Sequence, residues 1–343
     1  MSYRYLGNKS RIADWIVEIV SKNLKPGDVI ADLMCGTATM SERFATSGYK
    51  VIAGDQLLFP VLHAKARLSC LDDDVFDKPS NNELGSYVNS IRILNDLKPV
   101  QGFFWKEYSD AGVPENGAKP RKYFTSGNAM KIDAIREQLR NWRSQGVDQD
   151  ICDLLLHDLI LASNKVANIA GTFGYYKANY CKSSLADITL QPSSSNQYDV
   201  EHEVIHGPVE ETSKIVKADA VYLDPPYTKR QYAGNYHIPE TLAQEDEPVP
   251  QGEGGLRDWQ KQASDFCYKR NVKKAFYDVI SNIAAPNVFI SYSEDGQIQH
   301  DDLIDILGDF GKVSVESMPL ERYRSNSKVK SGMVEERLYI LEK

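Results

Sequence analysis

The chain has 343 residues, 42% of them hydrophobic, which is enough to bury a core in one large domain or two smaller ones. Its formal net charge of −8 argues mildly against a nucleic-acid partner, although a phosphate responds to a local patch and not to the average. The five cysteines include no CxxC pair, which argues against a zinc ribbon or a disulfide framework. With no apolar signal-peptide core and no window near ~18 apolar residues, a soluble, intracellular protein is expected.

The first 60 residues predict the opening of a nucleotide-binding α/β sheet. Apolar residues recur at helical spacing and then give way to short apolar runs of strand type. The second of these runs ends in an acid, Asp55. The elements expected are a helix over 10–23, a strand over 29–33, a helix from the turn 35–38 to Phe44, and a strand over 50–55.

The middle of the chain, about 59–200, has a different pattern. Residues 132–142 and 151–166 have helical periodicity, while strand–helix alternation is missing from the pattern. The stretch 191–198 (QPSSSNQY) is typical of a loop or linker. This region therefore predicts helices joined by long polar loops.

Alternation of strands and helices resumes in the last third. The elements expected are strands over 204–205, 218–223 and 288–292, helices over 269–283 and 303–307, and a terminal antiparallel pair over 312–317 and 337–341. The simplest architecture is an α/β domain made of residues 1–60 and 200–343, interrupted by a helical insertion over 61–199.

The sharpest chemical signal is the segment in which an apolar strand, Val221 to Leu223, runs into Asp224-Pro225-Pro226-Tyr227. Ligands in open α/β sheets bind at the carboxyl ends of strands. The two prolines lack N–H groups and fix φ, so the turn is rigid and its carbonyls can accept hydrogen bonds. A fixed carboxylate and a fixed carbonyl can hold both hydrogens of an amino group, and the tyrosine ring can stack on a planar base.

Those four residues resemble motif IV of the amino-methyltransferases, (D/N)PP(Y/F/W). The chain resembles the Dam-like α-group of DNA adenine methyltransferases, and within it the FokI-type modification enzymes, over nearly its whole length. The segment 5–9 (YLGNK) resembles motif X, and 32–38 (DLMCGTA) resembles motif I, DxFxGxG. The resemblance implies a Rossmann-like S-adenosylmethionine-dependent methyltransferase sheet with an inserted target-recognition region, and no metal. It implies catalysis by Asp224, Pro225, Pro226 and Tyr227, and cofactor binding by Tyr5, Gly7, Lys9, Asp32, Gly36, Thr37, Asp55 and Asp224.

Motif I departs from the family pattern at two positions. Met34 stands where the family has Phe, and Ala38 stands where it has the second Gly. The methyl group of Ala38 narrows the space expected near the cofactor. The acid expected after the third strand is not obvious, and Glu210 is the nearest substitute.

Basic residues gather in three stretches despite the acidic total, at 119–143, 164–182 and 322–330. Such stretches suit contacts with phosphate, although a charged run is also typical of a solvated face. The residues predicted to contact DNA are Arg121, Lys122, Arg230, Arg322 and Arg324.

The segment His202-Glu203-Val-Ile-His206 also satisfies the H-E-x-x-H pattern of zinc proteases. That chemistry requires a helix, whereas Val-Ile inside the motif and Gly207-Pro208 after it favour a strand. In a strand the two histidines would lie roughly 13 Å apart, too far to share one zinc ion.

The expected function is therefore site-specific methylation of the 6-amino group of adenine in duplex DNA, with S-adenosylmethionine as methyl donor. We expect a modification enzyme of a restriction–modification system in the cytosol of a bacterium or phage host, with a cognate restriction endonuclease as a candidate partner. Two alternatives stay open: an amino-methyltransferase acting on RNA or on a protein glutamine, and an inactive relative that only binds DNA.

Overall fold

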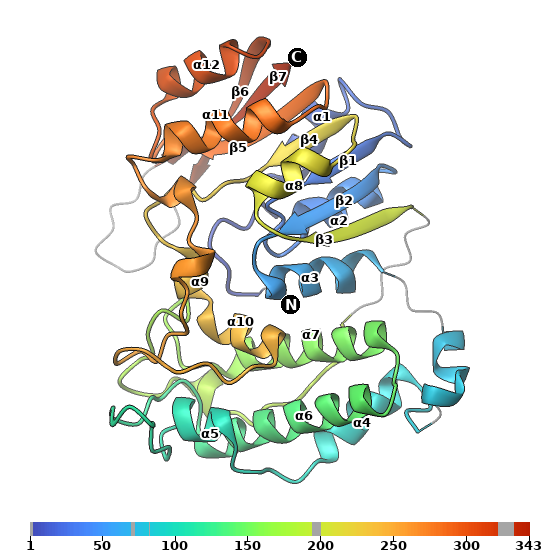
Figure 1. Cartoon of the computed structure of the whole chain (residues 1–343), viewed down its shortest axis with the longest axis vertical. Coiled ribbons are helices and arrows are strands. Elements are labelled where there is room, and N and C mark those ends of the chain that lie inside the picture. The colour runs from blue at the N-terminus through green and yellow to red at the C-terminus, as the bar shows by residue number, and fades with distance from the viewer. Residues whose placement is uncertain (1–2, 70–72, 82, 194–199, 322–332) are drawn as a thin grey trace. The chain divides into compact units, whose positions relative to one another are not determined.

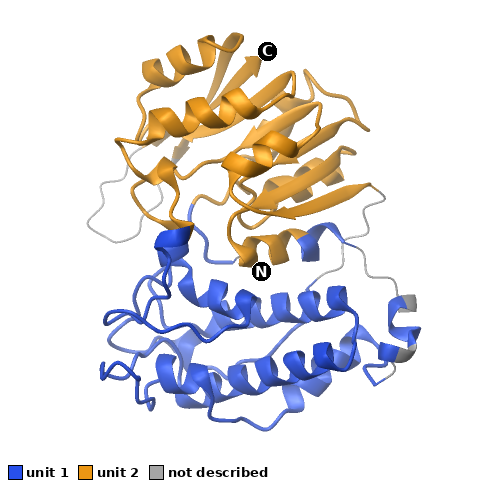
Figure 2. Ribbon diagram, viewed as in Figure 1, with its two compact units in different colours: residues 1–6, 65–197, 233–261 blue, residues 7–64, 198–232, 262–343 orange. Residues whose placement is uncertain are grey.

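The computed structural model of the chain describes residues 3–69, 73–81, 83–193, 200–321 and 333–343 (Figure 1). It divides into two compact units (Figure 2). The helical unit comprises residues 1–6, 65–197 and 233–261, and the sheet unit comprises residues 7–64, 198–232 and 262–343.

The sheet unit is built on a mixed sheet whose described strands run in the order β3-β2-β1-β4-β5-β7-β6. The strands from β3 to β5 pair in parallel, and β7 pairs antiparallel with both β5 and β6. The bounds are β1 Val29–Asp32, β2 Lys50–Asp55, β3 His202–His206, β4 Ala220–Leu223, β5 Asn287–Ser293, β6 Lys312–Glu321 and β7 Met333–Glu342.

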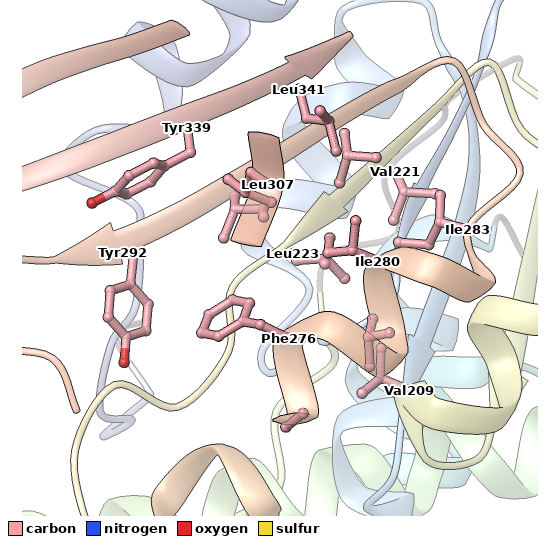
Figure 3. Close-up of a cluster of buried hydrophobic side chains, with 14 of the residues drawn as sticks. Val209, Val221, Leu223, Phe276, Ile280, Ile283, Tyr292, Leu307, Tyr339 and Leu341 are labelled. Atoms are coloured by element: carbon pink, nitrogen blue, oxygen red, sulfur yellow. The ribbon is translucent and has the colours of Figure 1, made fainter. Parts of the chain in front are cut away.

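Helices cover both faces of this sheet, because successive strand residues point to opposite sides. On one face, Ile280 of the amphipathic helix α11 and Ile283, which directly follows that helix, pack beside Val221 and Leu223 of β4 (Figure 3). On the other face, Phe44 of α2 meets Tyr222 of β4 edge-on at 5.5 Å between ring centroids. The helices of this unit are α1 Ala13–Val20, α2 Thr39–Thr46, α8 Val209–Ile215, α11 Val272–Asn282, α12 His300–Gly308 and the short η5 Asp265–Cys267.

The helical unit is dominated by two long helices, α6 Ser126–Ser144 and α7 Gln149–Val166. Side chains cap both starts: the Thr125 hydroxyl accepts from the Asn128 N–H, and the Asp148 carboxylate accepts from the Asp150 N–H. Its other helices are α4 Tyr87–Asp96, α5 Phe103–Tyr108, α10 His237–Gln244, η1 Asp73–Asp77, η2 Pro79–Asn81 and η3 Lys182–Leu185, while α3 Leu58–Leu68, α9 Tyr232–Asn235 and η4 Gln260–Gln262 contain unit boundaries.

The secondary structure confirms the predicted strands and the predicted α/β fold class. The His-Glu-Val-Ile-His segment is strand β3, as expected from its composition. The terminal antiparallel pair is also confirmed, with Val313 opposite Leu341. None of the helices in the described residues is long and apolar enough to cross a membrane.

The unit boundaries correct the predicted limits of the domains in one respect. Residues 1–6 and 233–261, expected in the α/β domain, belong to the helical unit. Residues 233–261 belong there because they form hydrogen bonds with the rest of the helical unit. The Tyr123 hydroxyl donates to the Gly254 carbonyl at 3.0 Å, and the His237 ring forms a hydrogen bond with the Phe173 carbonyl at 2.9 Å. The roles assigned to the two regions stay predictions.

Candidate active site

Three carboxylates lie at the carboxyl ends of adjacent parallel strands. Asp32 ends β1, Asp55 ends β2, and Asp224 follows β4 directly. Burial raises the pKa of Asp32 to about 7, and the negative charges of Asp224 and Asp55 add to that rise. The edge of the sheet is therefore acidic and suits a ligand that carries positive charge or donates hydrogen bonds.

One oxygen of the Asp32 carboxylate lacks a hydrogen-bond partner within the described residues. The Ser41 hydroxyl, from α2, donates to Oδ2 at 2.6 Å, whereas the buried Oδ1 has no hydrogen-bond partner. Buried carboxylate oxygens in folded proteins nearly always have donors. The unpartnered oxygen therefore indicates a place for a donor from a ligand.

The turn after β1 is held by the acid that ends β2. The Gly36 N–H donates to Asp55 Oδ2 at 3.0 Å, and the Leu57 N–H donates to Oδ1 at 3.0 Å. Thr37 is buried, and its hydroxyl accepts from the Asn8 side-chain amide at 3.2 Å, which joins the two segments that resemble motifs I and X. Both ends of this turn, Gly36 and Ala38, have left-handed backbone, with φ of 53° and 55°.

The left-handed backbone at Ala38 explains why motif I of the methyltransferases that this chain resembles has glycine at that position. A residue with a Cβ pays roughly 1–2 kcal/mol in this conformation. Ala38 is fully buried and precedes α2 directly, so the substitution leaves the turn in its expected shape.

Lys9 is buried and lies between two carboxylates. Its Nζ is 3.1 Å from Asp224 Oδ1 and 2.6 Å from Glu336 Oε1, and Glu336 also accepts from the Ser291 hydroxyl at 3.1 Å. Burial alone would lower the pKa of Lys9, but Asp224 and Glu336 raise it above its usual value, so the ammonium stays charged. The same Nζ is 5.4 Å from the centre of the Tyr227 ring.

Asp224 retains access to solvent, with 18% of its side chain exposed. Burial raises the pKa of Asp224 to about 6, and Glu336 raises it further while Lys9 lowers it. The carboxylate is therefore mostly ionised at neutral pH and can accept hydrogen bonds.

Gly7 makes room for the aromatic side of this site. Its φ is +76°, and a Cβ there would lie 3.2 Å from the Tyr232 hydroxyl oxygen and 3.7 Å from that of Tyr227. Tyr227 in turn meets Tyr292 edge-on at 6.3 Å between centroids. A side chain at position 7 would therefore crowd the Tyr232 hydroxyl, whereas its Cβ would be in ordinary van der Waals contact with Tyr227.

Of the predicted residues, the sheet unit thus brings together Gly7, Lys9, Asp224 and Tyr227, with Pro225 buried and Pro226 partly buried in the same turn. Tyr5 belongs to the helical unit, where its ring stacks on Tyr236 at 4.9 Å. Its expected place at the cofactor stays a prediction.

The prediction that Arg121 contacts DNA is wrong. Its side chain is fully buried and its Nη1 pairs with Glu107 at 2.6 Å, while Nε donates to the Glu253 carbonyl at 3.0 Å. Lys122 and Arg230 are exposed, as their predicted role requires. Arg322 and Arg324 lie outside the described residues.

Other cations of the 119–143 stretch are also engaged inside the helical unit. Arg136 is fully buried beside Asp133, Arg143 pairs with Asp153 and Glu245, and Lys131 donates to the Asn95 carbonyl. The basic residues of the 119–143 stretch therefore largely form ion pairs and hydrogen bonds inside the helical unit.

Sequence reasoning missed Glu336, Ser291 and Ser41. Glu336 lies in β7 beside other charged residues and has the local pattern of an exposed strand position. Its partner Lys9 is more than 300 positions away, so no local signal could have identified it. The described residues contain no group of three His, Cys, Asp or Glu side chains arranged to hold a metal ion.

The strand order, the single strand that runs against the others, and the acids at the ends of β1, β2 and β4 define the Rossmann-like fold of S-adenosylmethionine-dependent methyltransferases. The sequence family of the D12 class N6 adenine-specific DNA methyltransferases matches residues 5–292, and the chain belongs to this family.

Named relatives agree with this assignment. The modification methylase StsI of Streptococcus sanguinis is 29% identical over 99% of this chain and 52% of its own length. The type II methyltransferase M.NlaIII of Neisseria lactamica is 29% identical over 99% of both chains. M.FokI of Planomicrobium okeanokoites is 28% identical over 99% of this chain and 52% of its own. The chain thus spans about half the length of StsI and M.FokI and nearly all of M.NlaIII.

Among solved structures, a magnesium protoporphyrin IX methyltransferase from Synechocystis is 9% identical, with a TM-score of 0.34, over 97% of this chain and 79% of that chain.

Proposed function

We propose that the chain is a site-specific methyltransferase that moves a methyl group from S-adenosylmethionine to the 6-amino group of adenine in duplex DNA. The observation that carries the proposal is Asp224, which follows β4, has 18% of its side chain exposed, and pairs with Lys9 through Oδ1. We further propose that it modifies DNA in a restriction–modification system in the cytosol, beside a cognate endonuclease.

The residues at the strand ends fit the proposed methyl donor. Asp32 has a buried oxygen that needs a hydrogen-bond donor, which an ammonium group can provide. Asp55 already accepts two backbone N–H groups, but a carboxylate has about four acceptor positions and can also accept ribose hydroxyls. When bound, S-adenosylmethionine supplies the methyl group on a positively charged sulfur, which an edge with three carboxylates favours.

The chain itself has to hold the acceptor amine. Lys9 engages Oδ1 of Asp224, so Oδ2 can accept one amino hydrogen while the Pro225 carbonyl accepts the other. These bonds aim the nitrogen lone pair at the methyl group, so positioning and electrostatics provide most of the catalysis. Asp224 is also the nearest group that can take the proton that the amino nitrogen loses.

Tyr227 would stack on the face of the adenine ring, and its own ring is flanked by the Lys9 ammonium and by Tyr292. A base inside a duplex cannot reach a carboxylate at a strand end, so the adenine has to be turned out of the helix.

The direct test is tritium transfer from labelled S-adenosylmethionine to duplex DNA, to RNA, to a glutamine peptide, or to no acceptor. We expect label in adenine of duplex DNA alone. Label in RNA or in the peptide would establish the other amino-methyltransferase class, and DNA binding without any transfer would establish an inactive relative. Single-molecule sequencing of DNA from expressing cells would then give the methylated sequence.

A further inference from the structure

The cations of the helical unit fall into two groups. Those of the first group are held by carboxylates or carbonyls of the same unit, as Arg121, Arg136 and Arg143 show. The second group is exposed, and no ion pair to it occurs within the described part of the chain. What its members share is the lack of a carboxylate partner, although the Lys122 Nζ also donates to the Ala178 carbonyl at 3.5 Å. Its members are Lys98, Lys119, Lys122, Lys165, Lys177 and Lys182. In a protein of net charge −8, exposed lysines without a carboxylate partner favour an anionic partner.

Two of these lysines are fixed beside each other by one buried amide. Asn168 is fully buried, and its Nδ2 donates to the carbonyls of Lys122 at 3.0 Å and Lys177 at 2.9 Å. The Lys177 N–H donates back to the Asn168 carbonyl at 2.9 Å, and the Asn168 N–H donates to the Tyr123 carbonyl at 2.8 Å. The two backbone segments are therefore neighbours, although 55 positions separate the lysines in sequence.

The surroundings leave this positive charge largely uncompensated. The sequence from 159 to 186 contains no Asp or Glu.

The charge of Lys177 also acts, as the smallest of several influences, on the thiol of Cys181. Hydrogen bonds from the hydroxyls of Ser183 and Ser184 lower the pKa of Cys181 to about 6, and the charge of Lys177 contributes in the same direction.

We propose that Lys122 and Lys177 form a phosphate-binding pair that holds the backbone of duplex DNA. The proposal rests on the proposed function, which makes DNA the anionic partner, and it replaces Arg121 as the cation that acts beside Lys122. A lysine ammonium binds phosphate as a point charge without reading bases. The pair therefore contributes affinity, register on the duplex and salt dependence, and it contributes no sequence preference.

The test is the salt dependence of DNA binding by the full chain, measured on specific and random duplexes. The variant is Lys122→Ala with Lys177→Ala. Each lost phosphate contact flattens the log–log slope by about 0.9, so the double variant should lose close to ~2 from the slope on both duplexes.

A matched control removes the same charge elsewhere in the helical unit. Lys78 is exposed and Lys106 half-buried, and they pair with Asp148 at 2.7 Å and with Glu115 at 3.4 Å. Replacing both with alanine should leave the slope unchanged, and replacing Lys122 and Lys177 with arginine should keep the wild-type slope. Circular dichroism melting of every variant establishes that each is folded.

Equal salt slopes for wild type and the Lys122/Lys177 alanine variant would refute the proposed phosphate-binding pair. The same reduction of the slope in the Lys78/Lys106 control as in the Lys122/Lys177 variant would also refute it. Failure of the proposed function has a different signature. Wild type would then bind duplex DNA with the predicted slopes yet transfer no methyl group to it.

Discussion

The buried ion pair at Asp224 makes a signed prediction about pH. In the proposed reaction Asp224 acts as a carboxylate, so kcat/KM should fall as the pH drops through its pKa of about 6. Lys9→Met removes the cation 3.1 Å away and should move this acid limb to higher pH. Glu336→Gln keeps the side-chain shape and an acceptor for Lys9 but removes a negative charge, and should move the limb to lower pH.

The groups around Asp224 set the magnitude. An opposite charge within hydrogen-bonding reach shifts a carboxyl pKa by about 1–3 units. With a pKa of about 6, Asp224 is roughly 90% ionised at pH 7, and Lys9→Met should reduce that to between about 50% and about 1%. Activity at pH 7 should fall by about 2- to 100-fold and recover at higher pH. Asp32, Tyr222 and Tyr227 also interact with Asp224, and both variants keep these three side chains; the loss of Lys9 raises the pKa of Tyr227, so its hydroxyl stays neutral.

The assay is kcat/KM against pH from 5 to 9 with subsaturating DNA and saturating S-adenosylmethionine, which reports groups of the enzyme before it binds DNA. Calorimetry of S-adenosylmethionine binding at each pH separates loss of cofactor from loss of the ionised acid. A purely structural defect would lower the plateau and leave the limb in place. Identical acid limbs in wild type and both variants would refute the assigned electrostatic role.

Three further outcomes follow from the same structure. Asp224→Ala should abolish methyl transfer while leaving cofactor binding largely intact, and transfer within tenfold of wild type would remove Asp224 from its role. Asp55→Ala should weaken S-adenosylmethionine binding by about 1–3 kcal/mol through lost hydrogen bonds, and an unchanged dissociation constant by calorimetry would place the ribose acid elsewhere. Arg121→Ala should lower the free energy of unfolding by about 3–5 kcal/mol, because it leaves the Glu107 carboxylate buried without its cation. Denaturant titration checks this, and unaltered stability together with a flatter salt slope would restore Arg121 to the DNA surface.

The sequence predicted the sheet well because each strand is a short apolar run bounded by turn residues. It also predicted the acid at the end of β4, since Asp-Pro-Pro-Tyr is a local pattern with a chemical reason. The segment 202–206 shows the same strength: its residue types favoured a strand over the helix that a zinc site requires, and β3 is that strand.

What local patterns could not supply is the pairing of charges. Arg121 and Lys122 are adjacent and equally basic, yet one is fully buried against Glu107 and the other is exposed. Glu336 likewise has charged neighbours in sequence but is buried against Lys9. The burial of each depends on a partner that only the folded chain supplies, so composition cannot distinguish them.

The way the helical unit is assembled constrains any attempt to transplant DNA specificity between relatives. A chimera that exchanged residues 61–199 alone would separate Tyr123 from the Gly254 carbonyl and Arg121 from the Glu253 carbonyl. It would also replace the Phe173 carbonyl that His237 binds. Residues 233–261 should therefore be exchanged together with the insertion. Hybrid enzymes joined only at residues 61 and 199 should express poorly because the helical unit is destabilised, and not because of the bases they read.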